Sequence, residues 1–211
     1  MLELGCGTGA LWSQNTDRIP TSWNLVLTDR SEAILSGARE NLAEFGGGFQ
    51  FALADLQAVP LEDASLDAVI ANHVLFYAPD KPCVFAEIRR VLKPGGRVYA
   101  TTVGRNHMKE LRELACSFDP RLQLGNDAES FTLENGLSQM AEAFSSVTLS
   151  RYDDALEVSE PEPLVSYVLS IASADYDRRT EFLRFVDQHL ASLGGTMHIT
   201  KDSGIFHAYR P

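Results

Sequence analysis

The chain has 211 residues, of which 45% are hydrophobic, and its formal net charge at pH 7 is −11. This length fits one domain with a sizeable core. The acidic balance argues against a nucleic-acid partner, because affinity for nucleic acid comes from Lys and Arg that displace counterions. Cys6, Cys83 and Cys116 have no paired spacing, and the sequence contains no recognisable signal peptide or long apolar segment. We therefore expect reduced thiols in a cytoplasmic protein with no membrane partner.

The chain opens with a short apolar strand, residues 1–5, that runs into Gly5, Gly7 and Gly9. Glycines allow positive φ and leave no Cβ, so the backbone can lie against a ligand and a helix can begin directly behind it. With Ala10, the run also matches the G-x-G-x-x-A fingerprint of dinucleotide sites. The segment predicts a nucleotide-like ligand; a glycine turn without a ligand is the alternative.

Apolar strands and amphipathic helices then alternate, which predicts a doubly wound, mostly parallel α/β sheet with right-handed crossovers. Asp29 ends the second apolar run about twenty residues beyond the glycines, where a carboxylate can accept both hydroxyls of a ribose. This spacing suits both NAD and S-adenosylmethionine. The expected strands lie near 1–5, 24–28, 49–53, 66–72 and 97–103, and the expected helices near 10–18, 32–45, 80–93 and 106–117.

Lys93-Pro94-Gly95-Gly96 combines a cation, a helix breaker and two residues that tolerate a left-handed backbone. This run predicts the end of a helix. We interpret the nearby Arg89, Arg90 and Lys93 as solvated residues of that helix end, because the net charge offers no reason to expect a basic binding patch.

The C-terminal half has its own local signals. Ser159 to Glu162 has capping-box spacing with Pro161 in the first turn, and an apolar stripe recurs at helical spacing near Phe182 and Leu190. The expected elements are a helix over 131–144, a strand over 147–152, a helix from Pro161 to about 171, a helix within 176–193, and a β-hairpin whose strands, 197–200 and 205–209, flank residues 201–204.

Several segments of residues 1–104 together resemble the class I S-adenosylmethionine-dependent methyltransferases, particularly the methyltransferase type 11 group, which acts mostly on small molecules. They are Glu3 to Gly9, Asp29, Asp55-Leu56, Leu66 to Tyr77 and Glu87 to Gly96. The last of them resembles the family's helix and glycine turn before the fifth strand, which a dehydrogenase does not need. The resemblance implies S-adenosyl-L-methionine as cofactor and a small-molecule methyl acceptor. A Rossmann-type NAD-dependent oxidoreductase and a non-catalytic S-adenosylmethionine-binding protein remain as alternatives.

The resemblance also implies one methyltransferase domain over 1–211, with the cofactor-binding core in 1–104 and substrate-side helices and final strands in 105–211. Its last strand would return antiparallel between the fifth and sixth strands. The helices between 161 and 193 would wall the substrate pocket, with ordinary packing helices as the alternative. Family members carry helices before the glycine-loop strand, whereas Met1 lies inside that strand. We therefore expect a truncated chain with a wetter, more open pocket.

The residues that the resemblance assigns to the cofactor lie at or just after the ends of the expected strands. Glu3 would lie by the methionine part, the three glycines along methionine and ribose, and Asp29 at the ribose hydroxyls. Asp55 would accept from the adenine amino group, with the Leu56 backbone beside the ring. The full expected set is Glu3, Gly5, Cys6, Gly7, Gly9, Asp29, Arg30, Asp55, Leu56 and Asn72.

His73 is the expected general base, because imidazole titrates near neutral pH and the strand ends of such sheets open onto the ligand crevice. A structural histidine that bonds the backbone is the alternative. Tyr77 and His107 are further candidates of the same kind. The histidines and cysteines show no zinc-type spacing, so no metal is expected.

Overall fold

The computed structural model describes residues 1–45, 48–122, 124, 127–171 and 177–211. It divides into two compact units. The first contains residues 1–102, 130–150 and 204–211, and the second contains residues 103–129 and 151–203. Two later segments, 130–150 and 204–211, thus belong to the same unit as the first hundred residues.

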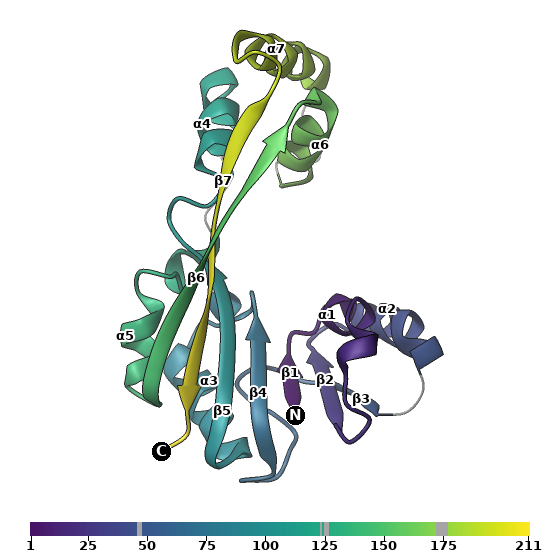
Figure 1. Cartoon of the computed structure of the whole chain (residues 1–211), viewed down its shortest axis with the longest axis vertical. Coiled ribbons are helices and arrows are strands. Elements are labelled where there is room, and N and C mark those ends of the chain that lie inside the picture. Colours follow the sequence, from purple (N-terminus) through teal and green to yellow (C-terminus); the bar gives the residue numbers. More distant parts are fainter. Residues whose placement is uncertain (46–47, 123, 125–126, 172–176) are drawn as a thin grey trace. The chain divides into compact units, whose positions relative to one another are not determined.

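A seven-stranded sheet runs in the order β3-β2-β1-β4-β5-β7-β6 (Figure 1). The first five strands are parallel and confirm the predicted ones, although β5 begins five residues earlier than expected. Strand β7 is antiparallel to β5, since Gly95 N–H donates to the Arg210 carbonyl at one end and Gly104 N–H to the Asp202 carbonyl at the other. The predicted antiparallel last strand is thus confirmed. The strands are β1 (Leu2–Leu4), β2 (Leu25–Asp29), β3 (Phe49–Leu53), β4 (Leu66–Asn72), β5 (Leu92–Val103), β6 (Ser145–Val158) and β7 (Met197–Tyr209).

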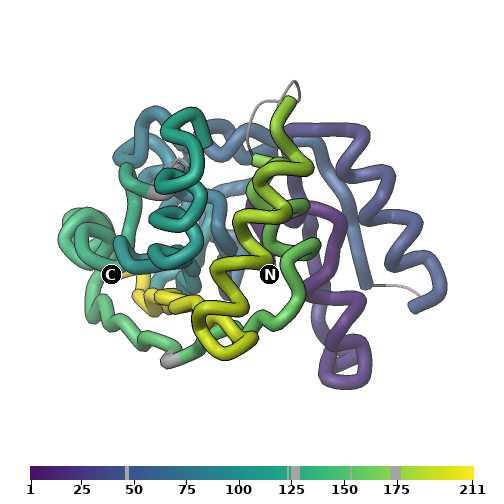
Figure 2. The backbone as a smooth tube through the Cα atoms, turned by 90° about the horizontal axis from the view of Figure 1, so that it is seen from above, coloured from purple at the N-terminus to yellow at the C-terminus, as the bar shows by residue number. Residues whose placement is uncertain are grey.

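Two helices of the first unit, α2 and α3, begin at capping side chains. The Ser31 hydroxyl accepts from Ile34 N–H at the start of α2, and Asp80 Oδ1 accepts from Cys83 N–H at the start of α3. Helix α2 packs against β2 and β3 (Figure 2). The expected helix 10–18 divides into a short helix and a separate 3-10 turn. The elements are α1 (Ala10–Ser13), η1 (Thr16–Arg18), α2 (Glu32–Leu42), η2 (Ala43–Phe45), η3 (Leu75–Tyr77), α3 (Lys81–Val91) and α5 (Gly136–Ala141).

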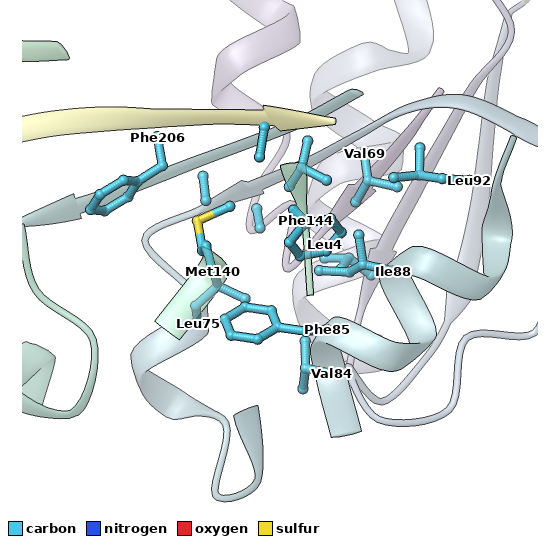
Figure 3. Packing of buried hydrophobic residues seen from close by; sticks show 14 of the residues in the cluster. Leu4, Val69, Leu75, Val84, Phe85, Ile88, Leu92, Met140, Phe144 and Phe206 are labelled. Carbon is cyan, nitrogen blue, oxygen red and sulfur yellow. The ribbon is translucent and has the colours of Figure 1, made fainter. Parts of the chain in front are cut away.

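Buried side chains occupy both faces of the sheet, which confirms the doubly wound fold. On one face, α3 and α5 contribute Ile88 and Met140 to a cluster with strand residues such as Val69 (Figure 3). On the other face, α1 and α2 pack Trp12 and Leu35 onto alternate residues of β2. The sheet is thus covered from both sides by the helices that follow its own strands, as crossover connections require.

Helix α3 ends at Val91, two residues before the expected end at 93, so Lys93-Pro94-Gly95-Gly96 lies in β5. The interpretation of the nearby basic residues is wrong for one of them. Arg89 and Lys93 are exposed. Arg90 is only partly exposed, and its guanidinium bonds Glu87, Asp63 and two backbone carbonyls. Long-range backbone partners of this kind leave no local signal in the sequence.

The expected helix over 131–144 is wrong at both ends, because α5 covers only Gly136–Ala141. Thr132 and Asn135 each bond the backbone N–H of the other at the start of this segment. Asn135 Oδ1 accepts from Thr132 N–H at 2.7 Å, and the Thr132 hydroxyl accepts from Asn135 N–H at 3.3 Å. This exchange is the capping-box pattern, which starts a helical turn at Thr132, whose carbonyl accepts from Gly136 N–H at 2.8 Å, and leaves Phe131 outside that turn.

The second unit has its own core of three helices and two strand segments. The predicted stripe on α7 is confirmed, with Phe182, Val186 and Leu190 buried against Val165 of α6 and Met197 of β7. Within the described residues, no helix has the length and apolar character needed to cross a membrane. The helices of this part are α4 (Lys109–Phe118), η4 (Asp127–Ser130), α6 (Pro161–Ile171) and α7 (Arg179–Ser192).

The predicted β-hairpin near the C-terminus is wrong, since residues 201–204 continue one uninterrupted strand, β7. The polar side chains of this run bond across the strand rather than forming a turn. Asp202 pairs with Arg151 at 2.8 Å and accepts from Asn106 N–H at 3.3 Å. Gly104 lies opposite Asp202, and a Cβ there would come within 2.1 Å of its carboxylate. Cross-strand contacts therefore override the local turn signal.

Candidate active site

The carboxyl ends of four parallel strands meet where the strand order reverses, between β1 and β4. Ligands of open α/β sheets bind at such a switch point. A pocket of about 340 Å³ lies here, and Asp29, Asp55 and His73 are among its lining residues. A larger pocket of about 740 Å³ in the same unit is lined by residues such as Met1 and Trp23, and includes none of these three side chains. The smaller pocket is therefore the candidate site.

The three glycines of the first loop have left-handed φ values of 64°, 56° and 76°. Their surroundings differ. A Cβ on Gly5 would lie 2.5 Å from Val74 Cγ2, and one on Gly9 would lie 3.0 Å from Leu42 Cδ1. A Cβ on Gly7 would meet nothing within 4 Å. Packing thus requires the outer glycines, whereas the middle one borders open space that a ligand can approach.

This difference gives a testable contrast between two alanine variants. Gly5→Ala is expected to destabilise the fold by at least about 1 kcal/mol more than Gly7→Ala, because both bear the left-handed backbone cost but only the first overpacks Val74. Urea unfolding of the two proteins measures the difference. Equal losses would contradict this assignment of the two glycines.

Asp29, the last residue of β2, holds the glycine loop. Its Oδ2 accepts from Gly7 N–H at 3.2 Å, and its Oδ1 accepts from Ser31 N–H at 3.0 Å. An ionised carboxylate offers about four acceptor sites, so roughly two remain for a ligand. The half-buried Asp29 can therefore hold a pair of hydroxyl groups while it fixes the loop above it.

Asp55 follows β3 and is exposed. Its Oδ1 accepts from Gln57 N–H at 2.8 Å, which closes a local turn beside Leu56. Among the residues that the structure describes, Asp55 Oδ2 has no protein partner, so it is available to a ligand donor. Leu56 is half buried, and Ile34 and Tyr77 add apolar surface to the same pocket. The arrangement suits a flat ring that has an amino group at its edge.

Glu3 lies beneath the loop and is only 3% exposed. Its Oε2 accepts from Trp12 Nε1 at 2.5 Å, and its Oε1 accepts from Asn72 Nδ2 at 3.3 Å. Burial raises the pKa of Glu3 to about 7, against the opposing effect of these two donors. Asn72 Oδ1 accepts in turn from the Thr101 hydroxyl at 3.1 Å. A buried chain of polar groups thus links α1, β1, β4 and β5.

His73 is the first residue after β4 and has a left-handed φ of 49°. Its backbone N–H donates to the Thr101 carbonyl at 3.1 Å and lies 3.2 Å from the Thr101 hydroxyl. The residue is exposed and lines the pocket. Histidine tolerates this backbone region better than most residues. The neighbouring strand therefore fixes the backbone of His73 at the rim.

The pocket brings together only part of the expected set. Its lining includes Gly5, Asp29, Arg30, Asp55, Leu56 and His73, and also the candidate Tyr77. The other expected residues lie outside this lining, in the loop and at the strand ends; they are Glu3, Cys6, Gly7, Gly9 and Asn72. His107 belongs to the second unit and does not line the pocket. Burial and nearby carboxylates raise the pKa of Cys6 to about 12, so this thiol is no nucleophile at neutral pH.

Sequence reasoning missed the residues that act through other side chains. Trp12 and Thr101 complete the network around Glu3 and Asn72, and Gln57 and Ile34 line the pocket. No motif marks them, because each is defined by a partner that is distant in sequence or by its place on the pocket wall.

Residues 2–100 match the family model of a methyltransferase domain. This range holds every residue that lines the candidate pocket. The sheet order, the strand-end carboxylates and the glycine loop define a nucleotide-cofactor site of the Rossmann-like type.

Two relatives that match this chain in sequence are also named as methyltransferases. The malonyl-[acyl-carrier protein] O-methyltransferase of Erwinia pyrifoliae is 31% identical over 150 residues, which are 71% of this chain and 55% of that protein. The ubiquinone/menaquinone biosynthesis C-methyltransferase of Escherichia coli O1:K1 is 30% identical over 139 residues, which are 62% of this chain and 55% of that protein. The chain thus spans about half the length of these two relatives.

A solved structure has a similar fold. A protein of Bacillus halodurans C-125 superimposes with a TM-score of 0.68 at 15% identity, and the match covers 100% of this chain and 91% of that one. Residues 2–100 therefore form a methyltransferase domain, and the family match and the named relatives support a class I S-adenosylmethionine-dependent methyltransferase. S-adenosylmethionine is the cofactor of this family.

Proposed function

We propose that the chain transfers a methyl group from S-adenosylmethionine to a small-molecule acceptor. The observation that carries the proposal is one pocket of about 340 Å³ in which the glycine loop, two strand-end carboxylates and an exposed histidine come together. That volume lies within the range of small-molecule sites.

The acceptor groups of the pocket match the hydrogen-bond donors of the cofactor. Asp29 has acceptor capacity left after its bonds to Gly7 and Ser31, which suits the two hydroxyls of a ribose. Asp55 has a carboxylate oxygen available for an amino group, beside the apolar Leu56. The open space at Gly7 lets a ligand lie against the loop. Glu3 would support the glycine loop without contacting the cofactor, because both of its carboxylate oxygens already accept hydrogen bonds from protein donors.

When bound, S-adenosylmethionine supplies a methyl group that is already activated for in-line displacement. The chain's own contribution is to orient the acceptor and to exclude water. His73 is the group at the pocket rim that can take the acceptor's proton. Thr101 bonds the backbone N–H of His73, so the Cα from which the imidazole extends has a fixed position.

The names of the relatives and the presence of His73 together suggest a class of methyl acceptor. Their names specify a carrier-bound malonyl group in one case and a quinone precursor in the other. A malonyl carboxyl is already ionised at neutral pH, whereas a quinone precursor must release a proton when one of its carbons is methylated, so only the second type gives a base a function. We therefore propose an acceptor that still holds a proton at neutral pH and must release it as it is methylated.

Asp29→Ala is expected to weaken S-adenosylmethionine binding by about 1.5 to 3 kcal/mol, the range for hydrogen bonds to a charged group. Equilibrium dialysis with radiolabelled cofactor measures the change. Asp29→Asn, which keeps one acceptor oxygen, should fall between the wild type and Ala. Unchanged affinity in Asp29→Ala would exclude Asp29 as the ribose ligand.

The activity itself is tested by incubating the protein with methyl-labelled S-adenosylmethionine and two acceptors, a malonyl thioester and a demethylated quinol. Transfer of label to either one supports the proposal. Cofactor binding without transfer to any acceptor would instead favour a non-catalytic S-adenosylmethionine-binding protein. Binding of NADH in place of S-adenosylmethionine would favour an oxidoreductase.

A further inference from the structure

The connection from β3 to β4 has no helix. Residues 54–65 form turns and bends, with one isolated bridge between Asp55 and Ala58. A crossover between parallel strands is normally made by a helix that packs on the sheet. This connection carries Asp55, Leu56 and Gln57 of the candidate pocket. Something other than helical structure must therefore hold it in place.

Arg90 of α3 supplies that support. Its Nη1 donates to the Leu61 carbonyl at 2.8 Å and to Asp63 Oδ1 at 2.7 Å. Its Nη2 donates to the Val59 carbonyl at 2.8 Å and to Glu87 Oε2 at 2.8 Å, and its Nε donates to Glu87 Oε1 at 2.8 Å. A guanidinium has five N–H donors, so all five are used.

Glu87 completes the arrangement from the same helix face. Its Oε2 accepts from Val59 N–H at 3.0 Å as well as from Arg90. The pair thus bonds both the N–H and the carbonyl of Val59, whose side chain is 4% exposed. At the other end of the connection, Ala54 N–H donates to the Asp29 carbonyl at 3.0 Å. The pocket segment is therefore fixed from both sides.

We propose that Glu87 and Arg90 are positioning residues that set the β3–β4 connection in its ligand-binding shape, so that Asp55 and Leu56 are pre-organised for the cofactor. The inference rests on the proposed cofactor site. Neither side chain lines the pocket, so their effect is indirect. If the connection is ordered only part of the time, the apparent dissociation constant rises by the inverse of that fraction.

The chain offers a matched control one residue away. Arg89 is exposed, and among the described residues no hydrogen bond or ion pair of its side chain is found. Arg90→Lys keeps the charge but replaces the planar fork by a single ammonium that cannot reach the same acceptors. Arg89→Lys makes the same chemical change at a side chain for which the described part of the chain shows no such partner.

The test compares amide hydrogen exchange of residues 55–63 and affinity for S-adenosylhomocysteine in the wild type, Arg90→Lys and Arg89→Lys. We expect faster exchange confined to 55–63 and about tenfold weaker binding in Arg90→Lys only. At saturating S-adenosylmethionine the turnover of Arg90→Lys should return to the wild-type value. Glu87→Gln keeps the Arg90 bonds to backbone carbonyls, so it should show faster exchange and weaker binding to a smaller degree. This variant replaces Arg90→Lys in the test if Arg90→Lys does not fold.

Unchanged exchange and unchanged affinity in Arg90→Lys would overturn the inference, as would faster exchange spread evenly over the whole sheet. Failure of the proposed function looks different. In that case the wild type itself binds no S-adenosylhomocysteine, while the exchange comparison still reports whether Arg90 orders the connection.

Discussion

Replacing His73 with asparagine is expected to lower turnover by about a hundredfold or more, with nearly unchanged affinity for S-adenosylmethionine. The reason is that asparagine tolerates the φ of 49° at this position but provides no base. The two backbone bonds to Thr101 do not depend on the side chain. Steady-state kinetics at saturating cofactor, together with a binding titration, measures both quantities.

A second variant of His73 distinguishes a general base from a structural residue. His73→Gly accommodates the same φ and leaves space at the rim, so added imidazole should restore part of the lost turnover. Wild-type turnover in His73→Asn would mean that positioning alone suffices. The histidine would then be a structural part of the strand end.

Replacing Glu3 with glutamine is expected to stabilise the protein above pH 7 by about 3 kcal/mol. The wild type must bury a charge there, because burial raises the pKa of Glu3 from 4.5 to about 7. Glutamine can keep the Trp12 bond through its carbonyl. Its amide can donate to Asn72 if the Asn72 amide turns over, since the Thr101 hydroxyl can donate or accept.

The pH window follows from the direction of this shift. A raised folded-state pKa means that the folded protein holds a proton that the unfolded chain releases near pH 4.5. The stabilisation by protonated Glu3 is therefore complete below pH 4.5 and is lost as pH rises through about 7. Urea unfolding of wild type and Glu3→Gln at pH 5 and pH 8.5 measures the change. Glu62→Gln, at an exposed carboxylate, is the control, and a difference independent of pH in Glu3→Gln would contradict the account.

The parts that could be predicted from sequence are those that local chemistry decides. Gly5 and Gly9 need a left-handed backbone, and Asp29 follows an apolar run at the spacing of a ribose ligand. Ser31 and Asp80 cap helices within three residues of themselves. Each signal depends on near neighbours, so it is visible without the fold.

The parts that could not be predicted depend on distant partners. Residues 201–204 have the composition of a turn, yet Asp202 is held in a strand by Arg151 and by the approach of Gly104. Arg90 has the composition of a solvated helix end, yet it bonds a connection almost thirty residues upstream. Glu3 does not line the candidate pocket and is connected to the site through its hydrogen bonds with Trp12 and Asn72.

Calorimetric titration of the unmodified protein with S-adenosylhomocysteine and, separately, with NADH tests the central claim most directly. The claim is that the pocket at Asp29, Asp55 and His73 is an S-adenosylmethionine site. The account predicts saturable binding of S-adenosylhomocysteine at one site per chain and far weaker binding of NADH. No binding of S-adenosylhomocysteine, or equally tight binding of NADH, would contradict it.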